Sequence, residues 1–181
     1  MAMGVLGSYA EYLPITSDTP LLSLGEGSTP LVRSVAIGPE LGIPELYFKL
    51  EGCNPTGSFK DRGMVLAVAK AVEQGYETIL CASTGNTSAA AAAYAAAAGI
   101  KSIVLVPEGD VSQGKLSQAI TYGAKVVVLK GRFDTALNIA REMVKSFNMC
   151  LVNSLNPHRI EGQKTASFEI VDEIGSAPEE L

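Results

Sequence analysis

Short apolar runs recur at a constant interval along the second part of the chain. They begin near residues 77, 101, 125 and 149 and have the sequences ETILCAS, KSIVLVP, KVVVLKG and MCLVNS. Such runs, rich in branched residues and without polar alternation, are typical of strands covered on both faces. Helical patterns occupy the intervals, at residues 86–98, 112–122 and 134–147. This alternation predicts parallel βαβ units with right-handed crossovers, and so an α/β fold with an open parallel sheet flanked by helices.

The two ends of the chain have a different pattern. The first 50 positions are rich in glycine and proline, and within them only Leu31–Arg33 and Glu45–Glu51 predict short strands. A helix is predicted from Ser58 to about Gln74. A last helix, Ile160–Ile174, leads into the polar sequence GSAPEEL. Such an ending is typical of the middle of a fold, and we expect this chain to belong to a longer one.

Composition argues against several classes of protein. Hydrophobic residues make up 47% of the 181 positions and charged residues 18%, a balance that argues against disorder. The net charge of −5, with no basic stripe, argues against a nucleic-acid partner. The longest apolar run, residues 89–98, is mostly alanine and too short to span a bilayer, so no membrane partner is expected.

The cysteines and the histidine argue against a metal site. Cys53, Cys81 and Cys150 are odd in number, far apart and without CxxC spacing, which makes a disulfide framework or a zinc site a poor fit. His158 is the single histidine, so a cluster of histidine ligands is excluded. The first residues lack the cationic and apolar regions of a signal or transit peptide. Together these features predict a reduced, cytoplasmic location.

Polar residues gather where predicted strands end and helices begin, which is where open parallel sheets bind ligands. The first cluster is NPTGSFKDRG, residues 54–63. Ser58 is expected to cap the helix, and Asp61 suits the positive end of the helix dipole. Lys60 does not, because a cation is disfavoured there and the same field favours the neutral, nucleophilic amine. From position alone, a solvated surface lysine is the alternative.

The second cluster is ASTGNTS, residues 82–88, between a strand and an alanine-rich helix. Ser83, Thr84, Asn86 and Thr87 combine hydroxyl and amide groups with free backbone N–H groups. This set forms a neutral pocket suited to a carboxylate or a phosphate. Ordinary N-capping is the alternative, but it needs only one of these side chains.

The third cluster, GDVSQGK at residues 109–115, has the spacing of a nucleotide-binding P-loop. The next residue is Leu116, where that motif needs a hydroxyl group for magnesium, and Pro107 interrupts the junction between strand and loop. We therefore expect no nucleotide site here. Lys115, near a helix N-terminus, is a candidate for binding a single phosphate, and a solvated lysine is the alternative.

The fourth cluster, NSLNPHR at residues 153–159, follows the last predicted strand. Arg159 can bind a phosphate through two parallel hydrogen bonds, with Asn153 and Ser154 completing the cup. His158 is expected to be a cap or a surface residue rather than an acid–base group. The cluster therefore predicts a second anion-binding junction.

These clusters, in this order, resemble the fold type II pyridoxal-phosphate enzymes, and within them the threonine synthases. NPTGSFKDRG is similar to the cofactor-lysine motif and ASTGNTSAA to the substrate loop. NSLNPHRIEGQKT resembles a stretch typical of threonine synthases, and the early GEGSTPL also fits. Serine and threonine dehydratases usually carry a GNH-type loop and cysteine synthases an SGNTG loop, where this chain has Gly85-Asn86-Thr87.

The resemblance implies pyridoxal 5'-phosphate as the cofactor, held by Lys60 as a Schiff base, with Asn86 bound to its ring hydroxyl. It implies that the substrate carboxylate is held by Ser83, Thr84 and Thr87. It also implies that the substrate phosphate is bound by Lys115, Asn153, Ser154 and Arg159. The implied reaction converts O-phospho-L-homoserine and water to L-threonine and phosphate.

The resemblance further implies a homodimer and a division into domains. Residues 1–50 would be the N-terminal part of a large domain, residues 51–158 a small α/β domain, and residues 159–181 the start of the remaining large domain. The glycine-rich loop that cups the cofactor phosphate in this family is missing from the sequence. We therefore expect the isolated chain to bind cofactor weakly and to turn over little.

Two alternatives stay open at this stage. The first is another fold type II amino-acid lyase, similar to serine and threonine dehydratases, or a β-replacement enzyme. The second is a non-catalytic ligand-binding module derived from the same fold.

Overall fold

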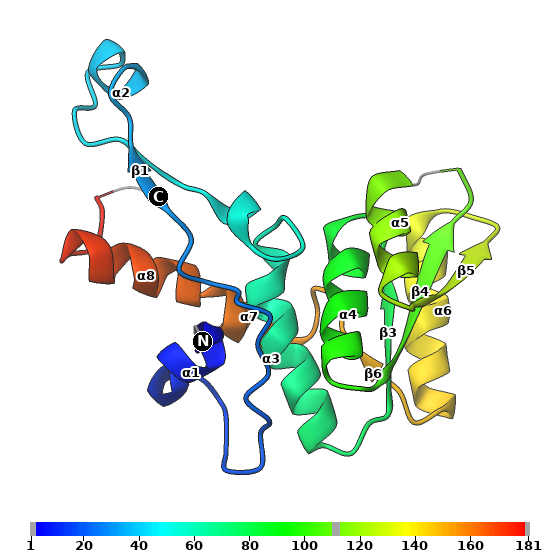
Figure 1. The fold of residues 1–181 in the computed structure, drawn as a ribbon. Coiled ribbons are helices and arrows are strands. Elements are labelled where there is room, and N and C mark those ends of the chain that lie inside the picture. The colour runs from blue at the N-terminus through cyan, green and yellow to red at the C-terminus, as the bar shows by residue number, and fades with distance from the viewer. Residues whose placement is uncertain (1–2, 110–112, 180–181) are drawn as a thin grey trace.

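A four-stranded parallel sheet with its helices forms one side of the structure, a computed structural model that describes residues 3–109 and 113–179 (Figure 1). The strand order is β5-β4-β3-β6. The strands are β3 (Thr78–Ala82), β4 (Lys101–Pro107), β5 (Lys125–Leu129) and β6 (Cys150–Leu151). Every neighbouring pair is parallel, which confirms the predicted open parallel sheet and all four strands.

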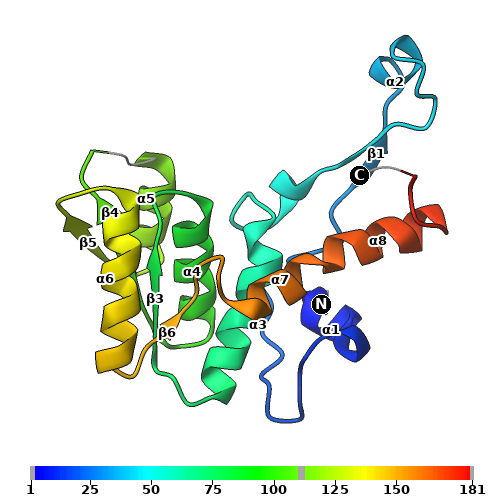
Figure 2. The ribbon, with the colours of Figure 1, turned by 180° about the vertical axis from the view of Figure 1, so that it is seen from behind.

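Helices cover both faces of this sheet (Figures 1 and 2). On one face lie α3 (Lys60–Glu73), α4 (Asn86–Ala97) and α5 (Gln113–Thr121), and on the other lies α6 (Phe133–Ser146). Successive strand residues point to opposite faces. Accordingly Ile79 and Cys81 join the core beneath α3 and α4, while Leu80 and Ala82 join the core beneath α6.

The alanine run of α4 has a packing function. Residues 88–95 of this helix are all buried, because α4 packs against the sheet, α3 and α5. A helix that is covered on several sides needs apolar residues all round. The small methyl groups let its neighbours approach closely.

The N-terminal residues lie outside the sheet. Helix α1 (Gly4–Ser8) and the 3₁₀ turn η1 (Ala10–Tyr12) are followed by an antiparallel ribbon of β1 (Leu31–Arg33) and β2 (Tyr47–Lys49). This confirms both short strands. The ribbon and α2 (Ile37–Glu40) extend away from the rest of the structure (Figure 1). A second 3₁₀ turn, η2 (Glu51–Cys53), leads from β2 toward α3.

The prediction of one C-terminal helix over Ile160–Ile174 is wrong. The structure has two helices, α7 (Pro157–Gln163) and α8 (Thr165–Ile174), which meet at Lys164. At the break, the Thr165 hydroxyl donates to the Gly162 carbonyl over 2.7 Å, and such a bond offers the backbone an alternative to continued helix. Helix α7 also begins earlier than predicted, because Asn156 caps it by accepting from the His158 N–H over 3.0 Å.

The start of helix α3 differs slightly from expectation. Helix α3 begins at Lys60 with Phe59 as N-cap, whereas the sequence indicated Ser58; the Ser58 hydroxyl instead accepts a 3.3 Å hydrogen bond from the Lys60 N–H. Residues 110–112 of the third cluster lie outside the described residues, and α5 is described from Gln113 onward. Over the two described ranges, no helix is long and apolar enough to cross a membrane.

Candidate active site

The loops that follow β3 and β6 meet at one edge of the sheet. Because these strands are parallel neighbours, their carboxyl ends lie side by side. The Asn153 side chain joins the two loops: its Oδ1 accepts from the Ala82 N–H over 3.0 Å, and its Nδ2 donates to the Ala82 carbonyl over 2.8 Å. The second and fourth sequence clusters are therefore brought together, and most of the Asn153 amide is used in holding them.

The third cluster contacts the first through Lys115. Its Nζ donates to the Thr56 carbonyl over 2.8 Å, in the loop that leads into α3. A Cβ atom on Gly57 would lie 3.4 Å from the same Nζ. Lys115 is partly buried at this contact and is not the solvated surface lysine that spacing alone allowed.

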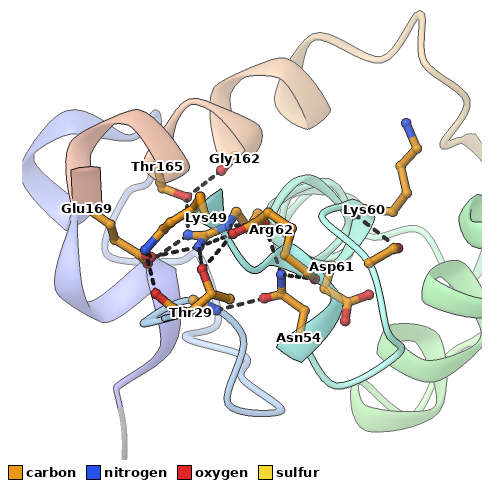
Figure 3. Close-up of polar contacts among 12 residues, drawn as sticks. Thr29, Lys49, Asn54, Lys60, Asp61, Arg62, Gly162, Thr165 and Glu169 are labelled. Atoms are coloured by element: carbon orange, nitrogen blue, oxygen red, sulfur yellow. Dashed lines mark hydrogen bonds and ion pairs between the residues drawn. The ribbon is translucent and has the colours of Figure 1, made fainter. Parts of the chain in front are cut away.

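Lys60 is the first residue of α3 and is partly buried. Its amine lies 3.9 Å from the ring centroid of Phe59 and points away from the side chains around Arg62 (Figure 3). Burial lowers the pKa of Lys60, and the positive charge of Arg159 lowers it further. Both effects favour the neutral amine, which is the nucleophilic form.

Arg159, the third residue of α7, is only 1% exposed. Its Nη1 donates to the Val152 carbonyl over 3.3 Å, but Nε and Nη2 have no hydrogen-bond partner among the residues that the structure describes. A buried charge with unpaired donors is costly, and burial lowers the pKa of Arg159. These two nitrogens are therefore available to donate to a group that the protein does not supply, such as an anion.

The remaining predicted residues lie around the same edge. Ser83, Thr84, Asn86 and Thr87 are partly buried at the start of α4. The Ser83 hydroxyl accepts from the Gly85 N–H over 3.3 Å, so it belongs to the turn before the helix. Ser154 is exposed, in contrast to Asn153 and Arg159.

The loop before Lys60 is fixed by Asp61. This carboxylate is fully buried and accepts from the Thr56 N–H over 2.6 Å and from the Thr56 hydroxyl. Burial raises the pKa of Asp61, against the lowering effect of these hydrogen bonds. The bonds hold the loop against the first turn of α3 and so restrict the backbone on which Lys60 is carried.

The sequence interpretation missed the most extensive polar cluster, which surrounds Arg62 (Figure 3). The Arg62 guanidinium is fully buried and contacts Glu51 and Glu169, at 2.8 Å from Nε and 2.7 Å from Nη2 respectively. Lys49 binds the same Glu169 carboxylate at 2.8 Å. A signal was available: residues 61–71 of α3 are all buried, and an arginine within such an apolar helix requires partners.

The Arg62 cluster ties α3 to segments that are far apart in the chain. Burial raises the pKa of Glu169, but hydrogen bonds from Arg62, Lys49 and the Ser28 N–H outweigh it and lower the pKa to about 2. Burial likewise lowers the pKa of Arg62, and its bonds to Glu169 and Glu51 outweigh this and raise it. Both partners therefore keep their charges at neutral pH.

The comparisons with known proteins identify the family. Residues 22–181 match the family described as pyridoxal-phosphate dependent enzyme, and the chain belongs to that family. The predicted cofactor is thus confirmed at the level of the family. The residues fit it: Lys60 supplies a partly buried amine of lowered pKa, and the adjoining loops supply hydroxyl, amide and guanidinium groups.

Curated relatives and solved structures also support membership of this family. A threonine synthase of Halalkalibacterium halodurans is 59% identical over 178 residues, which cover 98% of this chain and 50% of that protein. One of Methanocaldococcus jannaschii is 56% identical over 92% of this chain and 41% of its own length. Maize serine racemase superposes with a TM-score of 0.73 at 25% identity, covering 81% of this chain and 45% of that one. The chain spans about half the length of the curated relatives it matches.

We predict that Arg62→Ala lowers the free energy of unfolding by about 3–5 kcal/mol, because it removes the guanidinium partner of the buried Glu169 and the partly buried Glu51. Urea denaturation measures the change. Arg141→Ala is the control: Arg141 is an exposed residue of α6, and its guanidinium hydrogen-bonds the Asn138 side chain on the same helix, so a change within about 0.5 kcal/mol is expected. Equal stabilities of the two variants would contradict the role of the cluster.

The lowered pKa of Glu169 predicts the acid response of the protein. The group contributes stability above its ordinary pKa of 4.5, and this contribution is lost as the pH falls toward about 2. Glu169→Gln should therefore be less stable than the parent at pH 7 and decline less steeply between pH 4.5 and 2. Unfolding free energies measured across that range test this, and parallel pH profiles would refute it.

Proposed function

We propose that this chain supplies the lysine-bearing part of a threonine synthase, which converts O-phospho-L-homoserine and water to L-threonine and phosphate. The observation that carries the proposal is the buried Arg159 guanidinium, two of whose nitrogens have no partner in the part of the chain that the structure describes and are available to an anion beside the Lys60 loop. The curated relatives called threonine synthase support it, because they are 51–59% identical over 92–100% of this chain.

Lys60 would hold pyridoxal phosphate covalently. When bound, this cofactor supplies an electron sink for the carbons of an amino-acid substrate. The lowered pKa of Lys60 suits an amine that takes up and returns protons at those carbons near neutral pH. Asn86, at the first position of α4, would hydrogen-bond the ring hydroxyl of the cofactor.

The two anionic groups of the substrate would bind at different loops. Ser83, Thr84 and Thr87, with the N–H groups at the start of α4, would hold the carboxylate. Arg159 would bind the phosphate through Nε and Nη2, and Asn153 has one N–H left for the same purpose. Ser154 and Lys115 would complete the phosphate site, and for this Lys115 must exchange its bond to the Thr56 carbonyl for a phosphate oxygen.

The domain division also stays a proposal, in which residues 51–158 form the small domain and the flanking residues 1–50 and 159–181 belong to the large one. The Arg62 cluster supports it, because Glu169 of α8 contacts both Lys49 and the Ser28 N–H. The segments assigned to the large domain are thus bonded to each other across the start of α3. A homodimer and a cytoplasmic location would follow from the same assignment.

Reduction with borohydride after addition of pyridoxal phosphate tests the role of Lys60. We expect the reduced cofactor on the Lys60 peptide in mass spectrometry, because the lowered pKa of Lys60 favours the neutral, nucleophilic amine. Lys145, which is exposed and paired only with Glu142, is the internal control. A label on Lys145 equal to that on Lys60, or no label on Lys60, would overturn the assignment.

Arg159→Ala tests the phosphate site. Loss of a buried charged donor pair costs about 2–5 kcal/mol, so kcat/KM for O-phospho-L-homoserine should fall roughly 30-fold or more. Turnover of serine, which carries no phosphate, should fall much less. If the two substrates lose activity equally, the phosphate assignment is wrong and a related amino-acid lyase is the better description.

A further inference from the structure

Helices α3 and α7 cross at a pair of glycines. A Cβ atom on Gly162 would lie 2.3 Å from the Arg62 carbonyl oxygen and 2.8 Å from the Cα of Gly63. A Cβ atom on Gly63 would lie 2.5 Å from the Arg159 carbonyl oxygen. Both residues are buried, so the two backbones touch directly at this point.

The backbone conformation does not require glycine at either position. Neither residue is among the glycines with positive φ, and within a helix glycine is less favourable than alanine. The close contact between α3 and α7 is therefore the reason why both positions have glycine. An added methyl group at Gly162 would meet only backbone atoms, which cannot rotate away.

Each glycine lies one helical turn from a residue of the candidate site. Gly63 is three residues after Lys60 on α3, and Gly162 is three residues after Arg159 on α7. Residues three apart are neighbours on a helix surface. The distance between the two backbones at the crossing thus sets the distance between the Lys60 amine and the Arg159 guanidinium.

We propose that Gly63 and Gly162 are positioning residues: their contact fixes where Arg159 of α7 lies relative to Lys60 of α3, so that one anionic substrate can reach both groups. The proposal rests on the proposed function for its catalytic meaning, but the geometry is independent of it. Burial is the larger cause of the lowered pKa of Lys60, and the positive charge of Arg159 is the second cause. Moving α7 away from α3 would weaken the effect of the Arg159 charge on the pKa of Lys60.

Competitive labelling of amines with acetic anhydride tests the proposal independently of catalytic turnover. The extent of labelling is measured by mass spectrometry of the Lys60 peptide across a pH series. Gly162→Ala should shift the midpoint of Lys60 labelling to higher pH. It should also raise KM for O-phospho-L-homoserine more than for serine. A fall in Tm of roughly 5 °C is expected from overpacking, but a purely structural role would leave the labelling midpoint unchanged.

Two further variants sharpen the test. Arg159→Gln should shift the midpoint in the same direction without changing the crossing, and the double variant Arg159→Gln/Gly162→Ala should shift it little further. Gly52→Ala is the matched control, because a Cβ atom there meets nothing within 4 Å and φ is not positive. Gly52→Ala should leave the pH midpoint of Lys60 labelling unchanged.

The outcomes separate this inference from the proposed function. An unchanged midpoint in folded Gly162→Ala overturns the positioning role, even if Lys60 carries the cofactor. If Gly162→Ala does not fold, Gly63→Ala replaces it, because its added methyl meets the adaptable Gln163 side chain as well as one backbone atom. A shifted midpoint with no cofactor on Lys60 would retain the geometry and overturn the function.

Discussion

The start of α3 is held in place by one buried guanidinium. Arg62 binds Glu51 in the turn before the helix and Glu169 on α8, and each carboxylate has further partners, among them Thr29 and Lys49. A charge that is shielded from water strongly destabilises the fold unless it has such partners. Because Lys60 is two residues earlier on the same helix, the geometry of the candidate site depends on this cluster.

The second constraint is electrostatic and lies at the site itself. Lys60 and Arg159 are close enough for the charge of one to affect the other, and Arg159 is buried with two unpaired nitrogens. A buried guanidinium with free donors is suited to bind an anion, which is the role proposed for Arg159. Tight packing elsewhere, including the glycine contact between α3 and α7, stabilises it.

The local pattern of the sequence was sufficient to predict the strands of the parallel sheet. The β-branched runs predicted β3, β4, β5 and β6, and strand–helix alternation predicted that they run parallel, because both depend on neighbouring residues. The resemblance also predicted the right family. The partners of Arg62 were not predictable in this way, since Glu169 is 107 positions away and no local pattern indicates that contact.

The errors have local physical causes. The break at Lys164 depends on the Thr165 hydroxyl bonding back to Gly162, an option that helical periodicity does not reveal. The phosphate role of Asn153 stays a prediction, and the sequence did not reveal that its amide also joins β3 to the loop after β6. A side chain that can bind either a ligand or the backbone has the same sequence signature in both cases.

A structure of the protein soaked with inorganic phosphate tests the central claim most directly. The account predicts phosphate oxygens within about 3 Å of Nε and Nη2 of Arg159, with the Lys60 amine facing the same ion. Phosphate bound elsewhere, with both Arg159 nitrogens still unpaired, would contradict it.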